Sequence, residues 1–276
     1  MKRVITMDKT KLIAMITLKE GIRNRALQGI LLIALFSSAA FLVVVPLFAF
    51  ETGKVVVDLG FAAMSLAGLA IVFFLAIALL TEDIHRRTIC LILSRPVSRA
   101  QYVLGKFFGL SIVIFLAVLI IALLALFFGW LGIQFIPAMT PPRHFSWGML
   151  ATGVLFNYIS LLIIMAVAFL STVVTTNAYL SMLVTFCVYV IGHSLETIVK
   201  IVLSGEFVKV GPIYTQMLKF FTWFFPNLNA FDLKVYIAYG LPLSASYCLW
   251  TVLYGIFYIA IVIFFTIILF KHKEIK

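Results

Sequence analysis

Residues 107–129 read FFGLSIVIFLAVLIIALLALFFG, a run that contains no charged side chain. A membrane-spanning helix needs about 20 consecutive apolar residues, because the hydrocarbon core of a bilayer is about 30 Å thick. The run therefore predicts a helix that crosses a membrane. Backbone polar groups inside lipid must be satisfied within the segment itself, which excludes an irregular loop at this place.

The composition of the whole chain points the same way. Of its 276 residues, 64% are apolar and 11% are charged, whereas a soluble domain has roughly 45–50% and 25%. Such a chain has room for about six spans and none for a separate soluble catalytic domain. The three cysteines, Cys90, Cys187 and Cys248, show no metal-ligand spacing, and we expect no metal and no cofactor in this chain.

Five further uncharged runs accompany the first one. Together the six runs predict an all-α membrane protein with six transmembrane helices over residues 26–270. The runs are 26–50, 59–80, 107–129, 149–170, 179–195 and 247–270.

The placement of basic residues predicts how these spans face. Residues 1–25, the loop 81–106 and the tail 271–276 hold 15 of the 21 lysines and arginines. Basic loops stay in the cytoplasm, so both termini are predicted to be cytoplasmic in a multi-pass protein of the cell inner membrane. The net charge of +11 is explained by this bias, and we expect no nucleic-acid partner.

The inner loop 81–106 reads TEDIHRRTICLILSRPVSRAQYVLGK, and its pattern predicts a folded segment rather than a flexible connector. Residues 84–93 favour a short amphipathic helix, which Pro96 would end because the residue before a proline avoids the helical region. Ser98 and Gln101 then fit a capping box that starts the helix of the third span. The simpler interpretation is that the arginines fix the membrane topology and contact anionic lipid headgroups. The more specific interpretation is that the loop is a docking surface for a soluble partner.

The new helix would be long. From Arg99 to Gly129 it would measure about 46 Å at 1.5 Å per residue, more than the hydrocarbon core, so its first turns should stand out in the cytoplasm.

Residues 1–25 predict a cytoplasmic amphipathic helix. Its apolar side chains lie near one helical face, and lysines and arginines lie off that face, which suits a helix lying along the inner membrane surface. It would serve either as a membrane anchor or as one wall of a docking cleft. The apolar side chains are Leu12, Met15, Ile16, Ile22 and Ala26.

These segments resemble the permease family of ABC-2-type transporters. The resemblance covers nearly the whole chain, and within the family the chain is most similar to small stand-alone permeases, including those that serve maturation of nitrous oxide reductase. It is carried by LKEGIRNR at 18–25, Glu82, RTI at 87–89, LSRPVSR at 93–99, LGK at 104–106 and FPNLNAF at 225–231.

The resemblance implies a half-transporter, in which two copies of the permease stand over two cytoplasmic ABC ATPase subunits. ATP and Mg²⁺ would bind to the ATPase, and the usual direction in the family is export. Residues 1–25 would be the interface helix and the inner loop would hold a coupling helix. The implied contacts with the ATPase are Glu20, Arg23, Glu82, Arg86, Arg87, Thr88, Arg95, Pro96 and Arg99.

The chain has no phosphate-binding loop of its own and is not expected to be an enzyme. Gly105-Lys106 is followed by Phe107 where the motif needs Ser or Thr, and Ala100 stands where its first glycine belongs. The uncharged runs hold no Asp, Glu, Lys or Arg, and this absence argues against a proton-coupled or sodium-coupled carrier.

Two features inside the membrane region have competing interpretations. Gly60, Ala63 and Ala67 form a small-residue face that suits either helix packing or a substrate pathway. Asn157 is more commonly an interhelical hydrogen-bonding residue than a ligand contact.

The segment 196–246 is aromatic and broken, and it predicts an interfacial or re-entrant outer segment before the last span. Accessory proteins on the periplasmic side are a further expected class of partner. The competing class for the whole chain is a non-transporting membrane scaffold that anchors a soluble protein; substrate-dependent ATPase turnover separates the two.

Overall fold

The computed structural model describes residues 2–45, 52–85, 97–135, 146–175, 177–204 and 212–272, and within these ranges the regular structure is helical, with no strand. The elements are α1 (Lys2–Arg23), α2 (Arg25–Val44), α3 (Thr52–Ile71), η2 (Val72–Ile77), α4 (Ala78–His85), α6 (Arg99–Phe135), α7 (Trp147–Thr175), α8 (Ala178–Ser204), α9 (Pro212–Phe224), η3 (Asn229–Phe231), α10 (Lys234–Tyr239) and α11 (Ala245–His272).

Six of the described helices are long and apolar enough to cross a membrane, as the sequence predicts. They are Arg25–Val44, Thr52–Asp83, Arg99–Phe135, Trp147–Thr175, Ala178–Val202 and Ala245–His272. The all-α, six-span fold class is thereby confirmed. Most of these helices extend beyond the uncharged runs, because a helix continues past the last apolar residue until a cap or a proline ends it.

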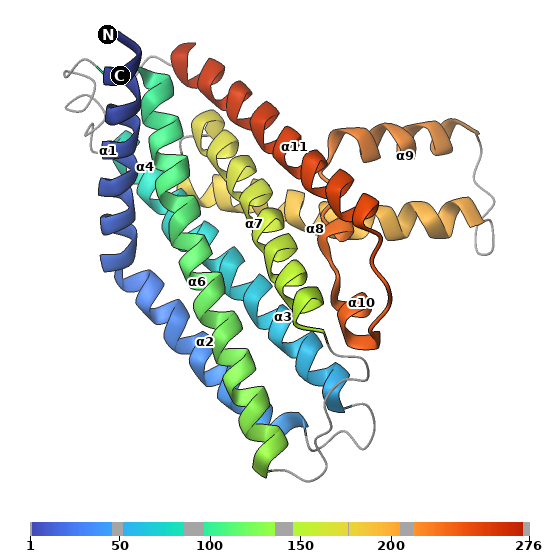
Figure 1. Cartoon of the computed structure of the whole chain (residues 1–276). Helices are drawn as coiled ribbons and strands as arrows, with labels where there is room; N and C mark the ends of the chain where they lie inside the picture. Colours follow the sequence, from blue (N-terminus) through green and yellow to red (C-terminus); the bar gives the residue numbers. More distant parts are fainter. Residues whose placement is uncertain are drawn as a thin grey trace.

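The core forms around α7. This helix packs against α3, η2, α6, α8 and α11, and its consecutive residues Ile163, Ile164 and Met165 are fully buried. A helix that is apolar on all sides belongs inside a bundle. The span α2 packs on α3 and α6 rather than on α7, and all the spans except α8 run in broadly similar directions (Figure 1).

The amino-terminal helix α1 packs lengthwise along α6 and in the same direction. Gly105 and Gly109 of α6 face Ile13 and Thr17, where an added Cβ would lie 2.7 Å from side-chain atoms of α1. Two glycines one helical turn apart thus allow α1 to pack closely against α6, and a position of α1 along the membrane surface stays a prediction. The predicted apolar face, including Leu12, Met15 and Ile16, is exposed and remains available to lipid.

The fifth candidate span, α8, departs from the common direction. It crosses behind α7 at a steep angle, and its second half projects beyond the other helices together with α9 (Figure 1). Most of its large apolar side chains are exposed. The uncharged run reveals the apolar character of α8, but not its tilt, because tilt depends on packing against neighbours.

The second candidate span contains a π-helical turn. Residues Val72–Ile77 adopt this wider helix between α3 and α4 and pack against α7. Single π turns are rare and occur often at functional sites. Here the turn separates the half of the span that holds Ser65 from the half that reaches Asp83. Asp83 lies at the end of the molecule that the basic residues predict to be cytoplasmic, which we call the inner end.

Candidate functional site

A buried lysine joins three helices at the inner end of the chain. Lys106 of α6 is 5% exposed, and its Nζ lies 2.7 Å from Oδ2 of Asp83 in α4 and 3.2 Å from Oε2 of Glu20 in α1. The hydroxyl of Tyr102 donates to the same oxygen of Asp83 at 2.6 Å. We call Glu20, Asp83, Tyr102 and Lys106 the inner polar cluster. A buried charge needs such partners, since an unpaired one costs several kcal/mol.

The start of α6 positions this cluster. The backbone N–H of Ser98 donates to Oε1 of Gln101 at 2.9 Å, and the N–H of Gln101 donates to Oγ of Ser98 at 3.2 Å, which confirms the predicted capping box. Once α6 begins there, Tyr102 and Lys106 fall four residues apart on one face of the helix. Both side chains therefore meet Asp83.

Arg99 connects the start of α6 to the end of α11. Its Nη1 donates to the carbonyl oxygens of Phe270 and Lys271, each at 2.8 Å. The last carbonyls of a helix have no partner within the helix, and a cation there also suits the helix dipole. Because Tyr102 stacks on Phe270 with ring centroids 6.0 Å apart, α11 is held at the same inner end.

The structure brings some of the predicted coupling residues together and leaves others apart. Glu20 belongs to the inner polar cluster, and Arg99 is bonded to α11. Arg23 and Glu82 are exposed near the cluster, on α1 and α4. Five predicted residues of the inner loop lie outside the described residues: Arg86, Arg87, Thr88, Arg95 and Pro96.

Sequence reasoning missed Asp83, Tyr102 and Lys106 as site residues. From the sequence, Lys106 belongs to the basic inner loop, to the LGK stretch of the family resemblance and to a rejected phosphate-binding motif, and none of these gives it a site role. The available signal was its position: a lysine followed directly by 23 uncharged residues, one turn after a tyrosine.

The small-residue face of α3 takes part in packing within the chain. A Cβ added at Gly60 would lie 3.4 Å from the Cβ of Ala125 in α6. Ala63 packs against the small apolar cluster of Phe41 and Val45, and Ala67 is buried in the main core. The observed contacts favour the packing interpretation of this face.

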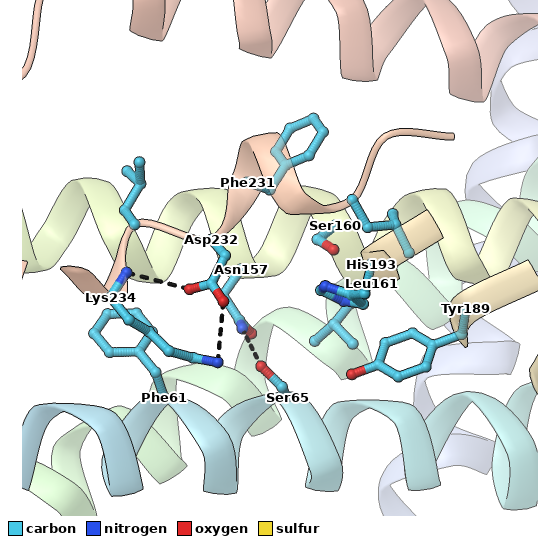
Figure 2. A pocket seen from close by; sticks show the side chains of 12 residues that line it. Phe61, Ser65, Asn157, Ser160, Leu161, Tyr189, His193, Phe231, Asp232 and Lys234 are labelled. Carbon is cyan, nitrogen blue, oxygen red and sulfur yellow. Dashed lines mark hydrogen bonds and ion pairs between the residues drawn. The ribbon is translucent and has the colours of Figure 1, made fainter. Parts of the chain in front are cut away.

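Asn157 makes the interhelical hydrogen bond that its residue type suggests. Its Nδ2 donates to Oγ of Ser65 at 2.7 Å and so links α7 to α3. Beside this bond, side chains from α3, α7 and α8 and from the segment 228–234 surround a pocket (Figure 2).

This pocket brings charged side chains from outside the uncharged runs against the candidate spans. His193 of α8 lines it together with Asp232 and Lys234, which come from the segment before α10. The two charged groups, Asp232 and Lys234, thus lie against the spans although the uncharged runs contain no Asp, Glu, Lys or Arg. The segment that carries these groups folds back toward α7, a tertiary event that no hydropathy pattern records.

The segment FPNLNAF at 225–231 docks on α8 through a glycine. The carbonyl oxygen of Gly192 accepts a hydrogen bond from the N–H of Leu228 at 3.1 Å. A Cβ at Gly192 would lie 2.7 Å from the carbonyl oxygen of Pro226, so only glycine permits this approach. Leu228 and Phe231 are buried as a result.

The fold and the two polar sites define a multi-span helical membrane protein. Its inner end is stabilised by ion pairs, and a polar pocket lies among its spans. The chain belongs to the ABC-2 transporter family: the model described as ABC-2 family transporter protein matches residues 24–275. It is accordingly a permease-type component of an ABC transporter, a class of subunit that typically works with an ABC ATPase. Among curated proteins the comparison finds no match to this chain.

Proposed function

We propose that this chain is the membrane-spanning subunit of an exporter driven by a separate cytoplasmic ABC ATPase. Two copies would form the membrane part, with both termini cytoplasmic in the cell inner membrane. ATP and Mg²⁺ would bind to the ATPase. The similarity to permeases of nitrous oxide reductase maturation stays a prediction, as does an accessory protein on the outer side.

The observation that carries this proposal is the inner polar cluster. Asp83 lies three residues before the start of the segment 86–96, and Tyr102 and Lys106 follow that segment closely. The two flanks of the loop are thus joined by an ion pair and a hydrogen bond, and the ion pair with Glu20 joins them to α1. A push on the loop by an ATPase would move α1, α4 and α6 together rather than deform the loop alone.

Charge reversal in the loop tests the coupling. The variants Arg87→Glu and Arg95→Glu should insert normally but lose the bound ATPase, or leave its turnover unstimulated. The measurement is affinity purification in mild detergent, followed by ATPase turnover of the recovered complex. Arg143→Glu, in a loop predicted to face outward, is the matched control and should change neither. Normal binding and stimulation in the inner-loop variants would overturn the proposed coupling surface.

The scaffold alternative gives a different result in the same assay. A transporter subunit should make ATPase turnover depend on the transported molecule, whereas a scaffold should leave turnover constant or recover a partner without ATPase activity.

A further inference from the structure

The pocket around Asn157 has the features of a binding site. It has a volume of about 110 Å³, which leaves space for several water-sized groups. Four segments distant in sequence line it: α3, α7, α8 and residues 228–234. Asn157, His193, Asp232 and Lys234 lie around the same space (Figure 2).

One polar atom in its wall lacks a partner. Nδ2 of Asn157 is bonded to Ser65, but no described residue hydrogen-bonds its buried Oδ1. Leaving a buried amide oxygen unsatisfied costs about 1–3 kcal/mol. Since the serine hydroxyl can donate or accept, either orientation of the amide leaves one of its two ends unpaired. A group in the pocket that both donates and accepts hydrogen bonds would pair with the free end of the Asn157 amide in either orientation.

The charges of the pocket balance one another. Nζ of Lys234 lies 3.2 Å from Oδ2 of Asp232, and the backbone N–H of Lys234 donates to Oδ1 at 3.2 Å. The pair leaves no unmatched formal charge for an ionic ligand. The remaining polar wall consists of neutral groups such as Ser65, Ser160 and the Asn157 amide, and Phe61 and Phe231 supply aromatic surface.

We propose that this pocket binds an uncharged, hydroxyl-bearing group, of the kind found in polyols and sugars. Hydroxyls both donate and accept, so they match a wall of amide, hydroxyl and paired ionic groups, while the apolar faces of a sugar ring suit the aromatic side chains. Such a group could arrive free in solution or as the head of a glycolipid. As a substrate site the pocket rests on the proposed function, but binding itself needs no ATPase.

The test measures binding to the purified full chain in phosphatidylcholine nanodiscs. The two probes are methyl glucoside, followed by saturation-transfer NMR, and monoglucosyl diacylglycerol, followed by native mass spectrometry. We expect at least one to bind: methyl glucoside alone indicates a free ligand, and the glycolipid alone a lipid. Binding of neither probe, or stronger binding of tetramethylammonium than of methyl glucoside, would overturn the proposal.

Two variants locate the binding in this pocket. Asn157→Leu should weaken binding at least about tenfold, because it removes the unpaired amide. Ser160→Ala keeps the bond between Asn157 and Ser65, and it should weaken binding about threefold. Thr152→Val is the control: it lies on the same helix, its hydroxyl bonds to Gly148, and it lines no part of the pocket. Equal binding by wild type and both pocket variants would overturn the assignment.

The outcome is independent of the coupling test. Loss of sugar binding in Asn157→Leu with normal recovery of the ATPase would support the pocket alone. Loss of the ATPase in Arg87→Glu with normal sugar binding would support the coupling surface alone.

Discussion

Lys106 is the residue on which the inner end of the molecule depends most. Its ammonium is almost completely buried, and it balances one carboxylate from α4 and another from α1. Removing it would leave Asp83 next to Glu20 without the cation between them. Breaking a buried ion pair by removing one partner typically costs about 3–5 kcal/mol.

We therefore expect Lys106→Met to destabilise the purified chain by about 3 kcal/mol, although methionine fits the space. The measurement is chemical unfolding of the chain in detergent. Lys200→Met is the control, since Lys200 pairs with Glu196 on an exposed helical surface and should contribute less than about 1 kcal/mol. Equal destabilisation by the two variants would mean that the inner polar cluster contributes little.

The hydrogen-bond partner of a side chain can be predicted from the sequence only where that partner is a few residues away. The capping pair Ser98 and Gln101 could be found, because its two members are three residues apart. The bonds of Lys106 to Glu20 and of Asn157 to Ser65 join residues 86 and 92 positions apart, and no pattern in one sequence reveals them.

At the scale of helices, contact between α1 and α6 depends on the absence of side chains. A Cβ at Gly109 would lie 2.7 Å from the carbonyl oxygen of Ala14, which is backbone and has little freedom to move. One turn earlier, a Cβ at Gly105 would lie 2.7 Å from the Cβ of Ile13. Close helix approach over two such glycines is typical of membrane proteins.

Gly109→Ala should therefore displace α1 from α6 and lower the melting temperature of the purified chain. Gly29→Ala is the matched control in α2: its added methyl group meets no atom within 4 Å, and alanine favours a helix over glycine by up to about 1 kcal/mol. We expect the control to be neutral or stabilising. A stabilised Gly109→Ala would contradict the close contact.

Helix number and helix chemistry follow from the sequence, whereas helix direction does not. The uncharged runs locate all six candidate spans, because lipid imposes length and apolarity on any helix that crosses it. They do not indicate that α8 crosses α7 steeply, or that η2 widens the second span, since both depend on packing.

For the whole molecule, the charge distribution predicts its orientation. Lysines and arginines gather in residues 1–25, 81–106 and 271–276. The described elements that belong to or flank these segments lie at one end of the molecule: Figure 1 shows the starts of α1 and α6 and the end of α11 together there. Because basic segments are retained in the cytoplasm, this end is predicted to be cytoplasmic.

Topology reporters check this orientation. Alkaline phosphatase, which is active only outside the cytoplasm, should be active when fused after Arg143 and inactive when fused after Lys276. A fluorescent protein that matures only in the cytoplasm should show the reverse pattern. Activity of the phosphatase at both positions would contradict the six-span arrangement.

The parallel packing of α1 on α6 has a consequence for biosynthesis. The facing pairs Ile13 and Gly105, Thr17 and Gly109, and Gly21 and Val113 are each 92 residues apart. At about 5–20 residues per second, a ribosome takes roughly 5–20 seconds to make the second member of each pair. During that interval α1 lacks its partner, so the face that later packs on α6 is exposed together with the face that is exposed in the folded chain. The nascent helix must therefore stay bound to the membrane surface or to a chaperone until the third span has been made.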